Sequence, residues 1–292
     1  MTTTNRRGFM VATAGAVLSG CAGAFRSTPG FEAQCKALEA EVGGRLGVAL
    51  LSTSTGVSAG YRADERFPMC STFKWLAAAY LLSRVDAGME RLDRRIGYGS
   101  NVLIDHSPVT SQHVAGGMTL AQLCEATITV SDNAAANLIL DTFGGPAALT
   151  RYLRSLGDNV TRLDRTEPAL NHVPPGDERD TTTPAAMTSD LRRLLLGTAL
   201  STASRDQLTR WMLATQTSGT RLRANLPPRW QLADKTGTAN GTANDVGVFW
   251  SPAGEAIALS VYLTECRAPA AQQNAAIAEV ARWVVSGAVG RT

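Results

Sequence analysis

The sequence predicts a mixed α/β fold, in which an antiparallel sheet built from both chain ends is flanked by helices and an all-α domain is inserted between them. Segments with the alternation of a strand occur near residue 50 and again after residue 230. The region between them carries the spacing of helices. We therefore expect an α/β domain made of residues 31–66 and 214–292, and an all-α domain over residues 67–213.

The composition is that of a globular chain. Its 292 residues are 44% apolar and 18% charged, which is enough for one or two domains with a real core. The formal charge of +3 falls to +1 without residues 1–20, which contain Arg6, Arg7 and no acid. That balance does not suggest a nucleic-acid partner, and we expect a monomer.

Residues 1–20 have the pattern of an export signal. The segment Arg6-Arg7-Gly8-Phe9-Met10 precedes an apolar run and resembles a Tat signal, and the run is too short to span a bilayer permanently. It ends in Leu18-Ser19-Gly20-Cys21, which resembles a lipobox, where the cysteine is lipidated and becomes the new N-terminus. The alternative is an ordinary signal cleaved nearby. We expect an exported, periplasmic protein, attached to the membrane if Cys21 is lipidated, with a tether over residues 21–30.

The first elements after the tether are a helix and a hairpin. Residues 31–42 predict a helix that ends at Gly43-Gly44. Residues 45–63 alternate and turn at Ser54-Thr55-Gly56, which predicts a β-hairpin. Residues 68–85 then predict a helix that is apolar on nearly every face and therefore belongs in a core.

Later segments carry capping signals and strands. Thr119 and Gln122 form a capping-box pattern, and Pro184 suits the first position of another helix. Strands are predicted at residues 230–238, 244–250 and 256–264, and a last helix at about 271–286. Residues 161–181 hold three prolines, many charges and no period. A structureless loop of that length inside a domain is usually functional.

Lys74 stands out in the apolar helix, because burying an ammonium is costly. Ser71 precedes it by one helical turn, so the amine can fold back to the hydroxyl. A serine nucleophile needs a base, and burial and neighbouring charge can lower a lysine pKa enough for that task. Backbone N–H groups at a helix start can also hold an oxyanion. The alternative is a capping serine and a lysine that reaches solvent.

The scarcity of lysine favours the catalytic interpretation. Of 28 basic residues only three are lysines, namely Lys36, Lys74 and Lys235. Arginine stays protonated, whereas lysine can lose its proton. Lys36, on a predicted surface helix, shows that scarcity alone does not make a lysine functional.

Two further motifs accompany Ser71-x-x-Lys74. Ser131-Asp132-Asn133 precedes an apolar helix and has the alternative interpretation of a capping turn. Lys235-Thr236-Gly237 lies at the end of a predicted strand, where glycine lets a ligand approach the backbone closely. Its alternative is a simple strand-end turn.

These three motifs, in this order, resemble the signature of class A β-lactamases and penicillin-binding proteins. The segment Arg165-Thr166-Glu167-Pro168-Ala169-Leu170-Asn171 is similar to the Glu-x-x-Leu-Asn segment of the class A omega loop. The resemblance covers nearly the whole chain after the tether. It implies the β-lactamase/D,D-peptidase-like fold and hydrolysis of penicillins and cephalosporins, which are small-molecule β-lactam substrates, through a Ser71 acyl-enzyme.

The resemblance also implies the role of each site residue. Glu167 and Asn171 would hold the water that hydrolyses the acyl-enzyme, Ser131 would pass a proton to the leaving nitrogen, and Asn133 would bind the substrate side-chain amide. Lys235, Thr236 and Thr238 would bind the substrate carboxylate, with Arg221 in support or else solvated at a helix end. The N–H groups of Ser71 and Thr238 would form the oxyanion hole. Further family features are a cis peptide before Pro168 and an Arg165–Asp180 pair across the loop neck.

Several alternatives stay open beside this interpretation. A penicillin-binding D,D-peptidase shares the acylating residues but lacks the glutamate, and a non-hydrolytic β-lactam-binding lipoprotein is a further class. The Gly56–Gly60 segment matches a Gly-x-Ser-x-Gly esterase pattern, but it reads as a hairpin arm. The three histidines, His106, His113 and His172, are not clustered, so we expect no metal and no other cofactor.

The sequence departs from the family in three places. His106 stands where most members have Tyr or Trp, Ala239 follows Thr238 where Gly or Ser is common, and residues 239–245 are one residue shorter than in some relatives. These departures leave the substrate range open. Some carbapenem-hydrolysing relatives join the residue before the nucleophile to the position that is Ala239 here. We therefore expect no disulfide at Cys70, and free buried thiols at Cys35, Cys124 and Cys266.

Overall fold

The computed structural model describes residue 25 and residues 29–287. A five-stranded antiparallel sheet has the strand order β2-β1-β9-β8-β7. Its strands are β1 (Arg45–Ser52), β2 (Ser58–Tyr61), β7 (Gln231–Ala239), β8 (Thr242–Trp250) and β9 (Ala256–Thr264). Two-stranded pairs join β3 (Phe67–Pro68) to β6 (Thr181–Thr182) and β4 (Arg95–Ile96) to β5 (Met118–Thr119).

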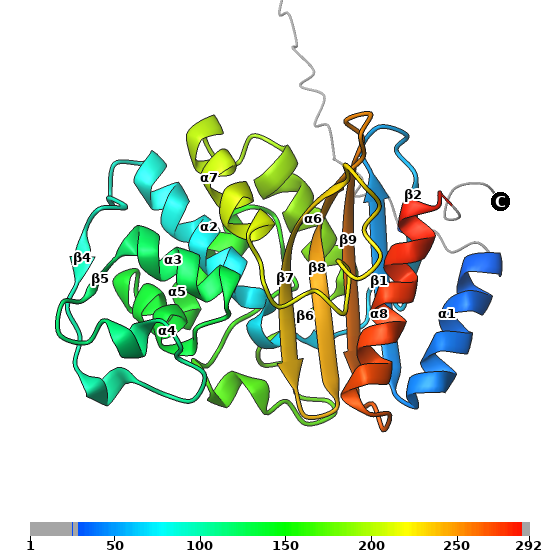
Figure 1. The fold of residues 1–292 in the computed structure, drawn as a ribbon, viewed down its shortest axis with the longest axis horizontal. Coiled ribbons are helices and arrows are strands. Elements are labelled where there is room, and N and C mark those ends of the chain that lie inside the picture. The colour runs from blue at the N-terminus through cyan, green and yellow to red at the C-terminus, as the bar shows by residue number, and fades with distance from the viewer. Residues whose placement is uncertain (1–24, 26–28, 288–292) are drawn as a thin grey trace, which may run out of the picture.

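Both chain ends build the large sheet, as predicted. Strand β1 lies beside β9, with Val48 opposite Val261, so the first and last strands of the sequence are neighbours. Helices α1 (Pro29–Val42) and α8 (Ala270–Val285) lie together on one face of the sheet (Figure 1). A core of buried side chains, including Phe31, Leu259 and Trp283, fills the space between these helices and the sheet.

The remaining helices form the other side of the molecule (Figure 1). They are α2 (Phe73–Asp86), α3 (Leu120–Thr129), α4 (Asn133–Thr142), α5 (Pro146–Ser155), α6 (Pro184–Leu191) and α7 (Thr202–Leu213). A short π-helix at Arg192–Leu196 directly follows α6. Their core also contains Ala233, Val246 and Tyr262 from the sheet. Helical and sheet parts therefore share one hydrophobic core, and the domain boundaries after residues 66 and 213 stay a prediction.

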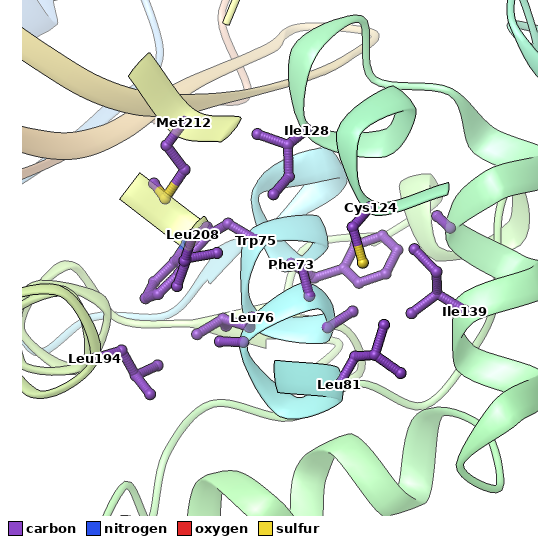
Figure 2. Close-up of a cluster of buried hydrophobic side chains, with 14 of the residues drawn as sticks. Phe73, Trp75, Leu76, Leu81, Cys124, Ile128, Ile139, Leu194, Leu208 and Met212 are labelled. Atoms are coloured by element: carbon purple, nitrogen blue, oxygen red, sulfur yellow. The ribbon is translucent and has the colours of Figure 1, made fainter. Parts of the chain in front are cut away.

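Helix α2 runs through the centre of that core. Phe73, Trp75, Leu76 and Leu81 are completely buried and point outward from α2 toward different neighbours (Figure 2). The neighbouring helices α3, α4 and α7 supply Cys124, Ile139, Leu208 and Met212. The prediction of a buried helix is confirmed. One difference is that residues 70–72 form a separate 3₁₀ turn, η1 (Cys70–Thr72), before α2 begins at Phe73.

Local signals placed other boundaries correctly. Thr119 and Gln122 form the reciprocal capping box of α3, and Thr183 caps α6 with Pro184 at its first position. The short 3₁₀ turns η2 (Ser100–Val102) and η3 (Thr110–Gln112) had no sequence signal, whereas η4 (Ala169–Asn171) directly follows Pro168, a residue suited to the start of a helical turn. One-turn elements depend on tertiary contacts more than on local pattern.

The cysteines of the described residues are free thiols. Cys35, Cys70 and Cys124 are buried, whereas Cys266 is half-buried, so the expectation of burial was wrong for Cys266. The export signal and Cys21 lie outside the described residues. Within the described part of the chain no helix is both long and apolar enough to cross a membrane, and no three His, Cys, Asp or Glu side chains gather as metal ligands.

Candidate active site

A cleft of about 290 Å³ opens between the start of α2, the start of α4 and strand β7. Eight residues selected from the sequence line it, together with one that was not selected, Thr217. The lining residues are Ser71, His106, Ser131, Asn133, Asn171, Thr217, Thr236, Gly237 and Thr238. The other selected residues of the described chain are buried behind this lining, namely Lys74, Glu167, Lys235 and Arg221.

Ser71 lies in the 3₁₀ turn η1, directly before α2. Its Oγ donates a hydrogen bond to Oε1 of Glu167 at 3.2 Å. The preceding Cys70 has φ +45°, in the left-handed region that favours glycine. Such backbone strain at a non-glycine residue persists only where the surrounding structure holds it, and it is common at functional sites.

Lys74 is completely buried, and its amine reaches acceptors on three residues. Its Nζ donates to the Ser131 carbonyl oxygen at 2.8 Å and to Asn133 Oδ1 at 2.6 Å, and it lies 3.1 Å from Glu167 Oε1. The expected contact with the Ser71 hydroxyl was wrong: no hydrogen bond in the described chain joins the two side chains. Instead both contact the same oxygen, Glu167 Oε1. Buried acceptors attract the ammonium because it has three protons to place.

Burial makes the Lys74 amine easier to deprotonate. Desolvation lowers its pKa below the ordinary lysine value, while the Glu167 charge acts in the opposite direction. The direction is the one that a lysine base requires. The neighbouring negative charge, however, works against the base role rather than for it.

Ser131 connects the two buried lysines. It has φ +62°, and its Oγ accepts hydrogen bonds from Lys74 Nζ at 3.2 Å and Lys235 Nζ at 3.0 Å. Because two ammonium groups occupy its acceptor positions, the Ser131 proton is directed away from them. Burial, and next the charge of Lys74, lower the pKa of Lys235 well below its usual range. Asp132 in the same motif caps α4 through Ala135 N, so the structural interpretation of this turn holds as well.

The loop of residues 161–181 brings Glu167 to the cleft. The peptide bond between Glu167 and Pro168 is cis, as the resemblance implied, and the turn η4 follows it. Asn171 Nδ2 donates to Glu167 Oε2 at 2.6 Å. Asn171 Oδ1 is a buried acceptor with no hydrogen-bond partner in the described chain. The Asn171 amide thus holds the Glu167 carboxylate through its nitrogen and leaves its own oxygen unsatisfied.

The neck of the loop carries the expected ion pair. Arg165 Nε lies 2.6 Å from Asp180 Oδ2, and Asp180 also accepts the backbone N–H groups of residues 164 and 165. Asp180 is completely buried, so this is more than a solvated surface pair.

Strand β7 lies against the chain that leads to Ser71. A Cβ on Gly237 would lie 2.6 Å from the Met69 carbonyl oxygen and 3.2 Å from both Cys70 Cβ and Asn244 Nδ2. Glycine is thus required by the protein's own backbone, in addition to lining the cleft. The sequence argument had considered only the approach of a ligand.

Arg221 is only 7% exposed, which excludes the solvated interpretation. Its guanidinium donates to the Gly237 and Asn244 carbonyl oxygens and to Thr238 Oγ1, each at 2.8 Å. It therefore holds the end of β7 and places a positive charge behind Thr238. His106, by contrast, is an exposed wall residue with φ +59°, and its Nε2 lies 2.9 Å from the Val130 carbonyl oxygen.

Two contributors were missed in the sequence. Thr217 Oγ1 lies 2.6 Å from Thr236 Oγ1 at the cleft wall, and it comes from a loop without any motif. Asn137 exchanges two 2.9 Å hydrogen bonds with the backbone of Glu167. A signal for Asn137 did exist: it lies four residues after Asn133 in an otherwise apolar helix, so both amides share one face.

This arrangement can perform covalent catalysis. A serine hydroxyl, a buried amine of lowered pKa and a carboxylate meet at one oxygen, and a second serine bonded to two lysines stands across the cleft. Beside the Glu167 carboxylate, Asn171 Oδ1 is a buried acceptor without a partner in the described chain.

Comparison with known proteins agrees with this geometry. Residues 30–287 match the model of the "Beta-lactamase enzyme family". The chain is 46% identical over 290 residues to a β-lactamase of Streptomyces fradiae, covering 95% of each protein. It is 47% identical over 255 residues to β-lactamase FAR-1 of Nocardia farcinica (strain IFM 10152), covering 87% of this chain and 82% of that protein. A solved structure of an ancestral class A β-lactamase (GNCA) is similar with a TM-score of 0.86 and 60% identity, covering 88% of this chain and 99% of that one.

Proposed function

The chain belongs to the class A serine β-lactamase family and is a β-lactam hydrolase, and on that premise we propose that it opens penicillins and cephalosporins through an acyl-enzyme on Ser71 that a Glu167-activated water hydrolyses. The observation that supports this most is the meeting of Ser71, Lys74 and Glu167 at one carboxylate oxygen. The rival, a penicillin-binding D,D-peptidase, would need only the first two.

In acylation Ser71 Oγ forms a bond to the β-lactam carbonyl carbon, and the ring C–N bond breaks. Lys74, whose pKa burial lowers, takes the Ser71 proton, for which the shared Glu167 oxygen provides a path. The proton then passes through Ser131 Oγ, which lies 3.2 Å from Lys74 Nζ, to the leaving nitrogen. The N–H groups of Ser71 and Thr238 bind the oxyanion that forms.

The substrate is held from both sides of the cleft. Asn133 Nδ2 already donates to the Asp105 carbonyl oxygen, and we propose that the same amide meets the substrate side-chain amide. Lys235, Thr236 and Thr238 bind the substrate carboxylate, with Arg221 supplying further positive charge through its bond to Thr238. Gly237 and His106 complete the wall.

In deacylation Glu167 takes a proton from water while the water oxygen bonds to the acyl carbon, and the Ser71 ester bond breaks. Asn171 orients the same water through its unpartnered Oδ1. The proton that Glu167 took from water passes to Ser71 Oγ, 3.2 Å from Glu167 Oε1, as the ester bond breaks, which restores both residues. Without a second base the ester persists, which is the behaviour expected of the rival class.

The test is Glu167→Gln, which keeps the shape and hydrogen-bond acceptor but removes the base. Because the Glu167 charge raises the pKa of Lys74, its loss leaves a larger fraction of that lysine neutral and able to accept a proton, and acylation should survive. Intact-mass spectra during benzylpenicillin turnover should then show a long-lived adduct on Ser71 in the variant and little on the wild type. Glu178→Gln, an exposed change on the same loop, is the matched control and should behave as wild type.

Equal trapping of penicillin by wild type and variant would favour a D,D-peptidase or a non-hydrolytic β-lactam-binding lipoprotein. Turnover by both without trapping would make Glu167 a loop residue only. Either outcome refutes the assignment of water activation to Glu167.

We also propose that the protein is exported to the periplasm as a monomer and is lipid-anchored at Cys21. The support is sequence alone: the twin arginines, the apolar run and the lipobox-like segment. Labelling of growing cells with a fatty-acid probe should mark the wild type and leave Cys21→Ser unlabelled. Labelling of neither protein, with cleavage at another position, would support an ordinary signal peptide.

A further inference from the structure

Two aspartates meet in the interior where the omega loop begins. Asp158 follows α5 and is 3% exposed, and Asp190 in α6 is completely buried. The Asp158 carboxyl group lies close enough to Asp190 to interact with it directly. Neither belongs to the motifs described above, and neither lines the cleft.

Asp158 organises the backbone at the start of the loop. Its Oδ1 accepts the N–H groups of Val160 at 2.8 Å and Thr161 at 3.0 Å. Arg154 Nη1 donates to the carbonyl oxygens of Asp158 at 2.6 Å and Thr161 at 2.8 Å. Thr161 in turn contacts Thr182, with 2.6 Å between the two hydroxyl oxygens, so both ends of the loop meet here. The position of Asp158 therefore determines where the segment that carries the catalytic glutamate starts.

The protonation of the pair can be read from its unpartnered oxygens. Asp158 Oδ2 and Asp190 Oδ2 are both buried, and neither has a hydrogen-bond donor among the described residues. The cation at the pair is Arg193, whose Nη1 lies 3.2 Å from Asp190 Oδ1. Two ionised carboxylates in contact would repel each other and leave two buried acceptors unsatisfied. One proton shared by the two carboxyl groups relieves the repulsion, and it leaves a single negative charge opposite Arg193.

The surroundings favour the protonated form. Burial, and then the Asp158 charge, raise the pKa of Asp190 well above its ordinary value, against the effect of Arg193. Tyr152 on α5 and Tyr262 on β9 also interact electrostatically with Asp190. Burial raises the pKa of each tyrosine, so both are neutral.

We propose that Asp158 and Asp190 share one proton and act as a positioning pair that holds the start of the loop carrying Glu167. The effect on deacylation rests on the proposed function, whereas the shared proton does not. A divalent cation between the two carboxylates is the rival occupant. Arg193 already supplies the positive charge there, and no third ligand lies near in the described chain.

The proton is tested by the free energy of unfolding between pH 4 and pH 8. An acid whose pKa is raised by folding stabilises the fold fully below the unfolded value, near 3.8, and this contribution is lost as the pH rises toward the folded value. In Asp190→Asn the amide N–H₂ replaces the shared proton and does not titrate. The ratio of the folding equilibrium constants of variant and wild type should therefore rise at least about tenfold from pH 4 to pH 8.

Asp158→Asn should reduce the slope, because it removes the neighbouring charge that adds to the effect of burial on the pKa of Asp190. Asp206→Asn, an exposed aspartate of α7, is the matched control and should run parallel to wild type. Parallel curves for wild type and Asp190→Asn would overturn the shared proton. So would stabilisation of the wild type by Ca²⁺ or Mg²⁺ that Asp190→Asn abolishes.

Positioning is tested by deacylation of the benzylpenicillin adduct at a temperature where all variants are folded. Asp190→Ala leaves the buried Asp158 Oδ2 with no carboxyl group to share a proton, and we expect deacylation to fall about tenfold or more, since small displacements of a catalytic group carry large rate effects. Asp190→Asn should restore it to within about twofold. Wild-type deacylation in Asp190→Ala, or failure of Asn to rescue, would overturn the positioning role. A wild type that forms no adduct and turns over no drug would instead refute the proposed function. The pH dependence of unfolding would then still show whether Asp158 and Asp190 share a proton.

Discussion

Gly237→Ala should reduce both stability and turnover, because its methyl group has no room. The added Cβ would lie 2.6 Å from the Met69 carbonyl oxygen, where an ordinary carbon–oxygen contact is about 3.3 Å. Something must therefore move by about 0.7 Å. The Cβ would also be 3.2 Å from Asn244 Nδ2, which itself donates to Met69 O at 3.2 Å. The methyl group thus acts as a wedge between two hydrogen-bonded partners, and relief of one contact lengthens the other.

The magnitude follows from these two effects. Overpacking of a tight site costs about 1–3 kcal/mol, and loss of the Asn244–Met69 hydrogen bond adds about 1 kcal/mol. A total of about 2–4 kcal/mol should lower the Tm by at least about 4 °C in a protein of this size. The segment that moves leads directly to Ser71, and a displacement near 1 Å at reacting groups can cost about 100-fold. We expect kcat to fall about 10- to 100-fold.

The assay combines thermal unfolding with steady-state hydrolysis of benzylpenicillin. Gly219→Ala is the matched control, because its added Cβ would have no atom within 4 Å and it lies in a nearby loop. It should keep wild-type stability. A Gly237→Ala protein with unchanged Tm and kcat would refute the argument that the backbone around Met69 and Asn244 requires glycine.

Three further outcomes are expected. Lys74→Arg keeps the charge but removes a usable base, so acylation by benzylpenicillin in rapid-mixing experiments should fall at least about 10³-fold, or roughly 4 kcal/mol; near-normal acylation would make Lys74 a structural cation. Thr217→Val removes the partner that orients the Thr236 hydroxyl and should raise KM about 2- to 10-fold with little change in kcat, whereas an unchanged KM would show that Thr236 needs no such support. Burial raises the pKa of Asp234 to about 6 against the effect of Arg223, so the contribution of Asp234 to stability is complete below its ordinary pKa of 3.8 and is lost as the pH rises to about 6. Urea unfolding of Asp234→Asn should lack this decline, and a decline equal to wild type would place the titrating group elsewhere.

Most secondary structure could be predicted from local pattern. Alternation and helical spacing determine the hairpin, the three late strands and helices α1, α2 and α8, and cap residues such as Thr119 and Thr183 mark helix starts. These features depend on neighbours within about four residues, which a sequence displays directly. The motifs likewise revealed the residues of the cleft, because each motif carries its chemistry in three or four consecutive positions.

Only the tertiary structure decided how those residues meet. Lys74 lies three residues from Ser71, yet its partners are Ser131, Asn133 and Glu167, because a buried ammonium seeks every acceptor within reach regardless of distance along the chain. The need for glycine at position 237 comes from Met69, about 170 positions earlier, and no local pattern encodes that contact.

The pair of Asp158 and Asp190 shows the same limit most clearly. Each looks like an ordinary surface aspartate in the sequence, one after a glycine and one in a helix. Burial brings them into contact and changes the charge state that the pair can carry. By itself the sequence determined which elements form and which residue types carry the chemistry. Packing decided which side chains lose water and which partners they then find, since desolvation is a property of the folded interior and not of the chain.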